Sequence, residues 1–136
     1  AARPGAVLSA AVAPDAQDAA DERMQDWRAW LTAGLVDAVA PMAYTQEASR
    51  FAEQIAAARD IAGGRAVWAG IGAYRLSPAQ TIENIQAARR LGAAGFVLFS
   101  YDSLTGTKSP SADYLATVSR GAFAVNSATP QLPTPK

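Results

Sequence analysis

Four short apolar runs recur along this 136-residue chain at an almost constant spacing, which limits the folds that the chain can adopt. The runs cover residues 6–13, 36–44, 66–74 and 95–101, so their starts lie about 30 residues apart. Each run has the length of a strand, and each intervening segment is long enough for a crossover helix. We therefore expect an α/β fold of parallel strands joined by right-handed crossovers.

The segments between the runs carry helical patterns. The first, at about 18–33, ends before Gly34, and the second, at about 49–62, ends before Gly63 and Gly64. Apolar residues recur at helical spacing in both. The side chains predicted to be buried are Met24, Trp27, Trp30 and Leu31 in the first helix, and Phe51, Ile55, Ala58 and Ile61 in the second.

The third helix has the clearest start signal. Ser77 is predicted to be its N-cap, Pro78 its first residue, and Gln80 the partner that completes a capping box. Ile82, Ile85 and Leu91 form its predicted buried stripe, and Gly92 ends it.

The chain after the fourth run is expected to form a loop at 103–110 and a short helix at about 112–119. The end of the chain is rich in Pro, Thr and Ser, which is typical of a tail or linker. The predicted organisation is one domain of four βα units at 1–120, followed by a tail at 121–136.

The composition excludes several kinds of chemistry. The chain has no Cys and no His, so it offers no thiol nucleophile, no Ser-His-Asp triad and no usual zinc site, and we expect neither a metal nor a cofactor. Twelve basic residues balance twelve acidic ones, and there is no charge run and no stretch of about 18 apolar residues. These features predict no nucleic-acid partner and no membrane partner.

Four parallel βα units form either a small doubly wound sheet or half of a (β/α)₈ barrel, whose repeat has about this length. No Gly-x-Gly-x-x-Gly follows the first run, and Gly70-Ile71-Gly72 lies inside a predicted strand and not on a phosphate-binding turn. Close packing of the backbone inside a barrel is the preferred explanation of this glycine pair.

The segment from Trp30 to Tyr44, WLTAGLVDAVAPMAY, is similar to the sixth helix–strand passage of bacterial glycosyl-hydrolase-like family 10 barrels. In that family a Trp-x-x-x-Gly-x-(Ile/Val)-Asp stretch leads into a strand that ends in an aromatic motif. Residues 8–14, 70–75 and 95–104 resemble its fifth, seventh and eighth strands in the same order. The resemblance implies that the chain is the C-terminal half of a TIM-type (β/α)₈ barrel, strands five to eight.

The chain also resembles the family 18 chitinases more distantly. Met42-Ala43-Tyr44-Thr45 is similar to their Met-x-Tyr-Asp motif, and 99–102 is similar to the end of their eighth strand. This chain departs from them at Thr45, where they carry Asp, and at Phe99, where they usually carry Trp. In both groups the catalytic carboxylates are expected on strand four, which would precede Ala1.

Candidate site residues follow from position, because the active face of such barrels lies at the carboxyl ends of the strands. A tyrosine at such an end can hydrogen-bond a sugar while its ring packs on the apolar face of the sugar. Arg75 can pair with an acidic group of the substrate or with a catalytic carboxylate of the missing half. The alternative is an ordinary surface cation. Gln46 and Glu47 lie in the loop after Tyr44, where they either contact the substrate or belong to a solvated loop. The predicted substrate-binding residues are Met42, Tyr44, Gln46, Tyr74, Arg75, Phe99 and Tyr101.

Asp15 and Asp102 are weak catalytic candidates at the ends of the first and fourth runs. Turn formation after Pro14 explains Asp15 nearly as well, and a loop-starting Asp that caps a turn is the commoner use of Asp102. Trp27 and Trp30 are expected in the core rather than on a sugar-binding surface.

The resemblance implies part of a glycoside hydrolase for poly- or oligosaccharides, with this chain contributing the sugar-binding half of the cleft and being inactive alone. The parent protein is expected to be exported. The alternative is a non-catalytic carbohydrate-binding or structural half-barrel. A half-barrel leaves two strand edges and an apolar face uncovered, so either a homodimer or association with the N-terminal half is expected.

Overall fold

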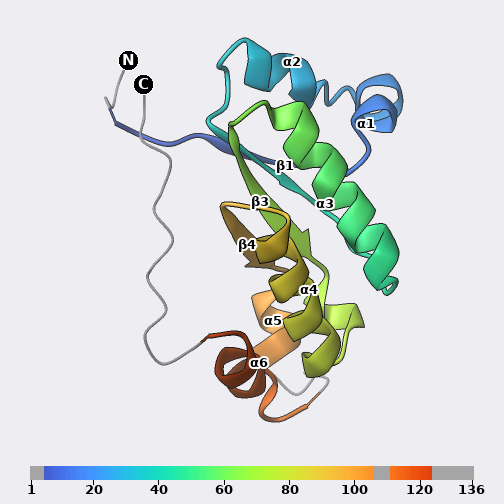
Figure 1. Ribbon diagram of the computed structural model, residues 1–136, viewed down its shortest axis with the longest axis vertical. Helices are drawn as coiled ribbons and strands as arrows, with labels where there is room; N and C mark the ends of the chain where they lie inside the picture. The colour runs from blue at the N-terminus through green and yellow to red at the C-terminus, as the bar shows by residue number, and fades with distance from the viewer. Residues whose placement is uncertain (1–4, 106–110, 124–136) are drawn as a thin grey trace.

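The computed structural model describes residues 5–105 and 111–123 and contains one four-stranded parallel sheet. Its strand order follows the chain order, and every predicted apolar run contains a strand (Figure 1). The strands are β1 (Ser9–Val12), β2 (Ala38–Pro41), β3 (Ala66–Ile71) and β4 (Gly95–Leu98). The α/β class and the parallel sheet are therefore confirmed, whereas the order gives no support to the doubly wound alternative.

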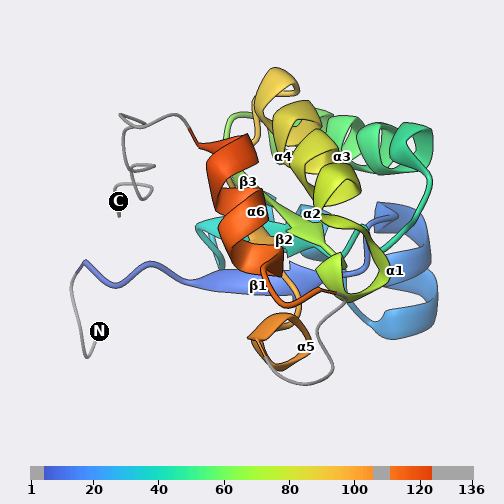
Figure 2. The ribbon, with the colours of Figure 1, turned by 90° about the horizontal axis from the view of Figure 1, so that it is seen from below.

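The two long helices that connect β2 to β3 and β3 to β4 lie together on one face of this sheet, whereas the short helix after β4 lies apart from them (Figures 1 and 2). This one-sidedness is expected when parallel strands are neighbours in chain order and every crossover has the same hand. In chain order the helices are α1 (Ala16–Arg23), α2 (Trp27–Thr32), α3 (Ala48–Ala62), the 3₁₀ turn η1 (Ala73–Arg75), α4 (Pro78–Arg90), α5 (Tyr101–Thr105) and α6 (Tyr114–Ala122).

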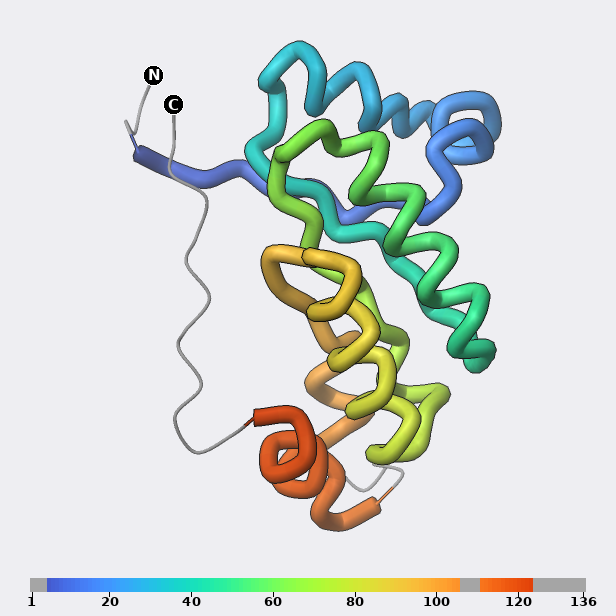
Figure 3. Tube along the Cα trace, in the orientation of Figure 1, coloured from blue at the N-terminus to red at the C-terminus, as the bar shows by residue number. Residues whose placement is uncertain are grey.

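The predicted first helix is wrong in one respect, because α1 and α2 are separate helices (Figure 3). Met24 adopts a left-handed conformation with φ 55° and is 87% exposed instead of buried. Asp26 starts the second helix by accepting a hydrogen bond from the Ala29 amide. The break lets buried Trp27 donate its Nε1–H to the Ala13 carbonyl at 3.1 Å, which ties α2 to the end of β1.

The second and third helices form where the sequence pattern predicts them, although Ile61, Ile82 and Leu91 of the predicted buried stripes are only partly buried. Phe51, Ile55 and Ala58 of α3 are buried, and the helix ends at Gly63 in the left-handed conformation. In α4 the predicted capping box is present: the Ser77 hydroxyl accepts from the Gln80 amide at 3.2 Å, and the Gln80 side chain accepts from the Ser77 amide at 2.9 Å.

The end of the chain differs from the sequence-based prediction. The loop expected at 103–110 begins inside helix α5, and its residues 106–110 lie outside the described residues. Helix α6 starts at Tyr114 and ends at Ala122, so it extends past the expected tail boundary at 121. The rest of that tail, from 124 onward, also lies outside the described residues.

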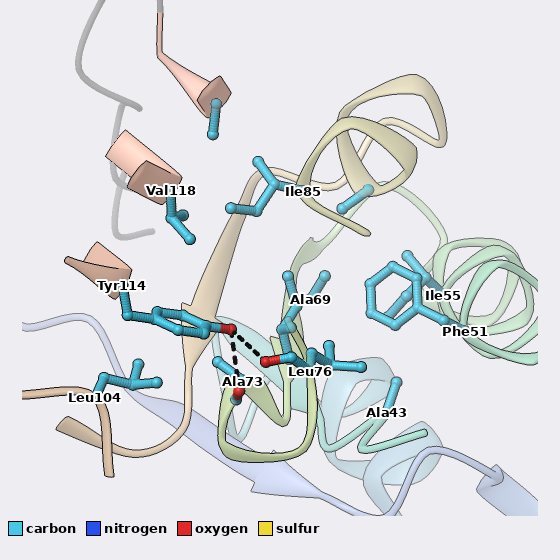
Figure 4. Close-up of a cluster of buried hydrophobic side chains, with 13 residues drawn as sticks. Ala43, Phe51, Ile55, Ala69, Ala73, Leu76, Ile85, Leu104, Tyr114 and Val118 are labelled. Atoms are coloured by element: carbon cyan, nitrogen blue, oxygen red, sulfur yellow. Dashed lines mark hydrogen bonds between the residues drawn. The ribbon is translucent and has the colours of Figure 1, made fainter. Parts of the chain in front are cut away.

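The core fills the space between the sheet and the helices in two clusters of buried side chains. Alternate strand residues point into it, including Val12, Val39 and Val67, and α3 contributes to both clusters. Figure 4 shows the cluster under β3 and β4, which includes Tyr114 of α6 and Phe51 of α3.

The opposite face of the sheet carries the other set of alternating residues. Strand periodicity places Ala40, Trp68 and Val97 there, and Val97 is 44% exposed. Parallel sheets are normally covered on both faces, whereas Val97 on this face is exposed in the described structure.

The glycine pair 70 and 72 has the role that close backbone packing predicts. A Cβ added at Gly70 would lie 2.5 Å from the Pro41 carbonyl oxygen, and one added at Gly72 would lie 2.9 Å from the Tyr44 Cβ. Only glycine lets β3 and the residue that follows it approach the end of β2 this closely.

Candidate functional site

Three aromatic side chains meet beyond the carboxyl ends of β2, β3 and β4. Tyr44 and Phe99 are stacked, with ring centroids 5.5 Å apart and planes 19° apart. Tyr74 stands edge-on to both rings, with its centroid 6.3 Å from that of Tyr44 and 6.0 Å from that of Phe99. We call these residues the aromatic cluster. Phe99 is 50% and Tyr74 42% exposed, so the cluster presents ring surface to solvent.

Backbone contacts fix the positions of these rings. The Phe99 amide donates to the Ile71 carbonyl at 2.9 Å, and the Tyr74 amide donates to the Phe99 carbonyl at 3.3 Å. The absence of a side chain at Gly72 leaves the space in which Tyr44 packs. The three segments after the strands are therefore joined into one surface.

The Tyr44 phenol is half-buried, and its pKa is raised above 10.0 by burial and, secondarily, by the neighbouring Tyr74. The phenol is therefore protonated at neutral pH and can donate a hydrogen bond as well as accept one.

Arg75 connects the aromatic cluster to an open pocket of about 420 Å³ beside it. Its Nη1 donates to the Tyr44 carbonyl at 3.3 Å, and its guanidinium lies 5.9 Å from the centre of the Tyr74 ring. Gln46 Nε2 donates to the Arg75 carbonyl at 2.9 Å. We call this pocket the arginine pocket; it is lined by Met42, Tyr44, Thr45, Gln46, Glu47, Arg50, Gln54 and Arg75.

Most of the predicted substrate-binding residues are thus brought together. Tyr44, Tyr74 and Phe99 form the cluster, whereas Met42, Gln46 and Arg75 line the adjoining pocket. Tyr101 is not part of either, because it begins helix α5 and is 73% exposed.

The two weak catalytic candidates have different surroundings. The Asp15 carboxylate caps helix α1 by accepting from the amides of Gln17 and Asp18, each at 2.9 Å. This accounts for Asp15 by local structure, as the turn interpretation predicted. Asp102 is an exposed residue in the first turn of α5, and it lies outside the aromatic cluster and the arginine pocket.

Sequence reasoning missed two residues of the pocket, Arg50 and Gln54. They lie one helical turn apart near the start of α3, which follows the loop that contains Gln46 and Glu47. The Gln54 Oε1 atom is buried without a hydrogen-bond partner. A signal existed in the sequence, because residues four apart in a helix share a face, but the sequence does not show that this face borders Arg75.

Comparison of the chain with models of protein families, with curated proteins and with solved structures found no match. The structure has no helix, among the residues it describes, that is long and apolar enough to cross a membrane.

Proposed function

We propose that this chain is the sugar-binding half of a glycoside-hydrolase-type (β/α)₈ barrel. The observation that carries the proposal is the aromatic cluster, in which three rings from the ends of consecutive strands share one exposed surface. Exposed rings are suited to the apolar face of a sugar, and the Tyr44 and Tyr74 hydroxyls are suited to its polar rim. The carboxyl ends of parallel strands are where barrel enzymes bind their substrates.

The half-barrel part of the proposal is supported by the topology. The four strands follow chain order, the crossover helices α3 and α4 lie on one face, and strand periodicity places Ala40, Trp68 and Val97 on the other face. The edges β1 and β4 each have one strand neighbour among the described residues. Four further strands would pair both edges and give the eight-stranded barrel whose interior side chains fill. The partner is either a second copy or a separate N-terminal half, and light scattering of the chain distinguishes a dimer from a monomer.

Catalysis is assigned to the missing half. Glycoside hydrolysis generally uses two carboxylates on either side of the scissile bond. Glu47 is the one acidic residue that lines the arginine pocket, and the aromatic cluster contains no carboxylate. The chain would therefore bind and orient the sugar, while the two carboxylates would come from the completing strands.

A non-catalytic carbohydrate-binding module is the second candidate function. It is favoured by the same observation, that the cluster offers binding surface without a carboxylate pair. The two candidates make the same prediction for this chain alone, namely binding without hydrolysis. Addition of an N-terminal half-barrel separates them, because only the hydrolase would then release product.

The test is calorimetric titration of the chain with short chito- and cello-oligosaccharides. We expect Tyr44→Ala to weaken binding at least about tenfold, because it removes the central ring of the cluster. Tyr101→Ala is the matched control, since Tyr101 is exposed outside the cluster, and it should bind as the parent does. Equal binding by the parent and Tyr44→Ala would refute the assignment of the site, and turnover by the isolated chain would refute the assignment of catalysis.

A further inference from the structure

We infer that the arginine pocket is a subsite for a carboxylate group, so that the sugar bound on the aromatic cluster is an acidic one. This inference rests on the proposed function and names its substrate class. It uses the two arginines that line the pocket, Arg50 and Arg75, which come from different elements, α3 and η1.

The first observation is that these guanidinium groups are available. Within the part of the chain that the structure describes, neither Arg50 nor Arg75 forms an ion pair. The Arg50 side chain makes no hydrogen bond there, and the Arg75 side chain uses one N–H for the Tyr44 carbonyl. A guanidinium has several N–H groups in a planar fork that matches a carboxylate, so Arg75 keeps donors for a ligand.

The second observation is that Arg75 is held in place. Its Nη1 is bonded to the Tyr44 carbonyl, its backbone carbonyl accepts from Gln46, and its guanidinium lies near the Tyr74 ring. A positioned arginine loses less conformational freedom on binding than a free surface side chain does. Arg75 therefore differs from an ordinary surface cation.

The third observation is the charge of the pocket. Two arginines face one carboxylate, that of Glu47, and the Glu47 side chain does not cap helix α3. The lining therefore keeps a net positive charge even when Glu47 is ionised. Since Tyr44 lines this pocket and also belongs to the cluster, a sugar on the rings has its substituents next to the arginines.

The remaining polar groups suit a sugar rather than a free anion. Thr45 and Gln46 line the same pocket, and the buried Gln54 Oε1 lacks a hydrogen-bond donor. A sugar hydroxyl can supply that donor, whereas an anion that carries no hydrogen, such as sulfate, cannot. A ring with hydroxyls and one carboxylate therefore matches the cluster and the pocket together.

The experiment compares short oligogalacturonates with their methyl esters, which have the same rings without the charge. We expect the acid to bind about tenfold more tightly than the ester at low salt, and the difference to shrink as salt is added. Arg75→Gln should remove most of the preference for the acid, so its affinity for the acid should fall by a larger factor than its affinity for the ester. Arg50→Gln should remove part of it.

Arg28→Gln is the matched control, because it removes the same charge from helix α2, outside the arginine pocket. It should keep the preference for the acid. Equal binding of acid and ester by the parent, or an unchanged preference in Arg75→Gln, would overturn the inference while the proposed sugar site stands. If no saccharide binds, including the neutral ones, the proposed function and this inference both fail.

Discussion

Tyr114 holds the segment that carries Tyr74 and Arg75, and this can be tested by removing one oxygen atom. Its side chain is 1% exposed, and its hydroxyl lies 2.6 Å from the Thr81 hydroxyl of helix α4. The same hydroxyl donates toward the carbonyls of Ala73 and Leu76 at 3.0 and 3.1 Å (Figure 4). Helix α6 is thereby joined to η1 and α4.

Tyr114→Phe keeps the ring but leaves the buried Thr81 hydroxyl and the Leu76 carbonyl without this partner. The Ala73 carbonyl still accepts from the Leu76 amide at 3.1 Å. Each buried polar group left unpaired costs about 1–3 kcal/mol, and some relaxation is expected, so we expect a loss of about 2 kcal/mol in the free energy of unfolding. The measurement is urea unfolding followed by circular dichroism.

The double variant with Thr81→Val makes the test specific. Replacing both hydroxyls by apolar groups removes the unpaired Thr81 hydroxyl, so the double variant should lose at least about 0.5 kcal/mol less than the sum of the single losses. Tyr101→Phe is the control and should change stability by less than about 0.5 kcal/mol, because Tyr101 is 73% exposed. A loss below about 0.5 kcal/mol in Tyr114→Phe would refute the reasoning.

Two further predictions concern stability. Gly70→Ala should lower the free energy of unfolding, measured by urea unfolding, by about 1–3 kcal/mol, because the new Cβ would meet the Pro41 carbonyl. Gly121→Ala is the control: its Cβ meets only the flexible end of Ile82, so the change should be neutral or stabilising. Equal effects of the two substitutions would contradict this explanation. Burial raises the pKa of Tyr44 and Tyr114 above the ordinary tyrosine value of 10.0 in the folded state. Their contribution to the free energy of unfolding is therefore complete below pH 10 and is lost as the pH rises through the folded pKa values. Urea unfolding between pH 8 and about 11 should show this loss of stability, and the loss should be smaller in Tyr114→Phe. A free energy of unfolding that does not fall over this pH range would refute the prediction.

The local signals in the sequence were strong enough to predict much of the fold. The Ser77 capping box and the glycines after α3 and α4 act within a few residues, so they appear in the structure as expected. The wrongly predicted first helix shows the limit of local signals. Apolar periodicity at Met24 suggested a continuous helix, but the bond from Trp27 to the Ala13 carbonyl belongs to tertiary structure.

The candidate site divides in the same way. The sequence by itself predicted Tyr44, Tyr74 and Phe99 at or near the ends of strands, because each lies at or near the end of an apolar run and parallel strands end at one edge of the sheet. Only the tertiary structure decided that the three rings touch, since their spacing depends on the packing at Gly72 and on the strand order. The same holds for Arg50, which shares its pocket with Arg75, and for the Tyr114 hydroxyl, which is bonded to the Leu76 carbonyl. These residues lie far apart along the chain, so no periodic pattern connects them.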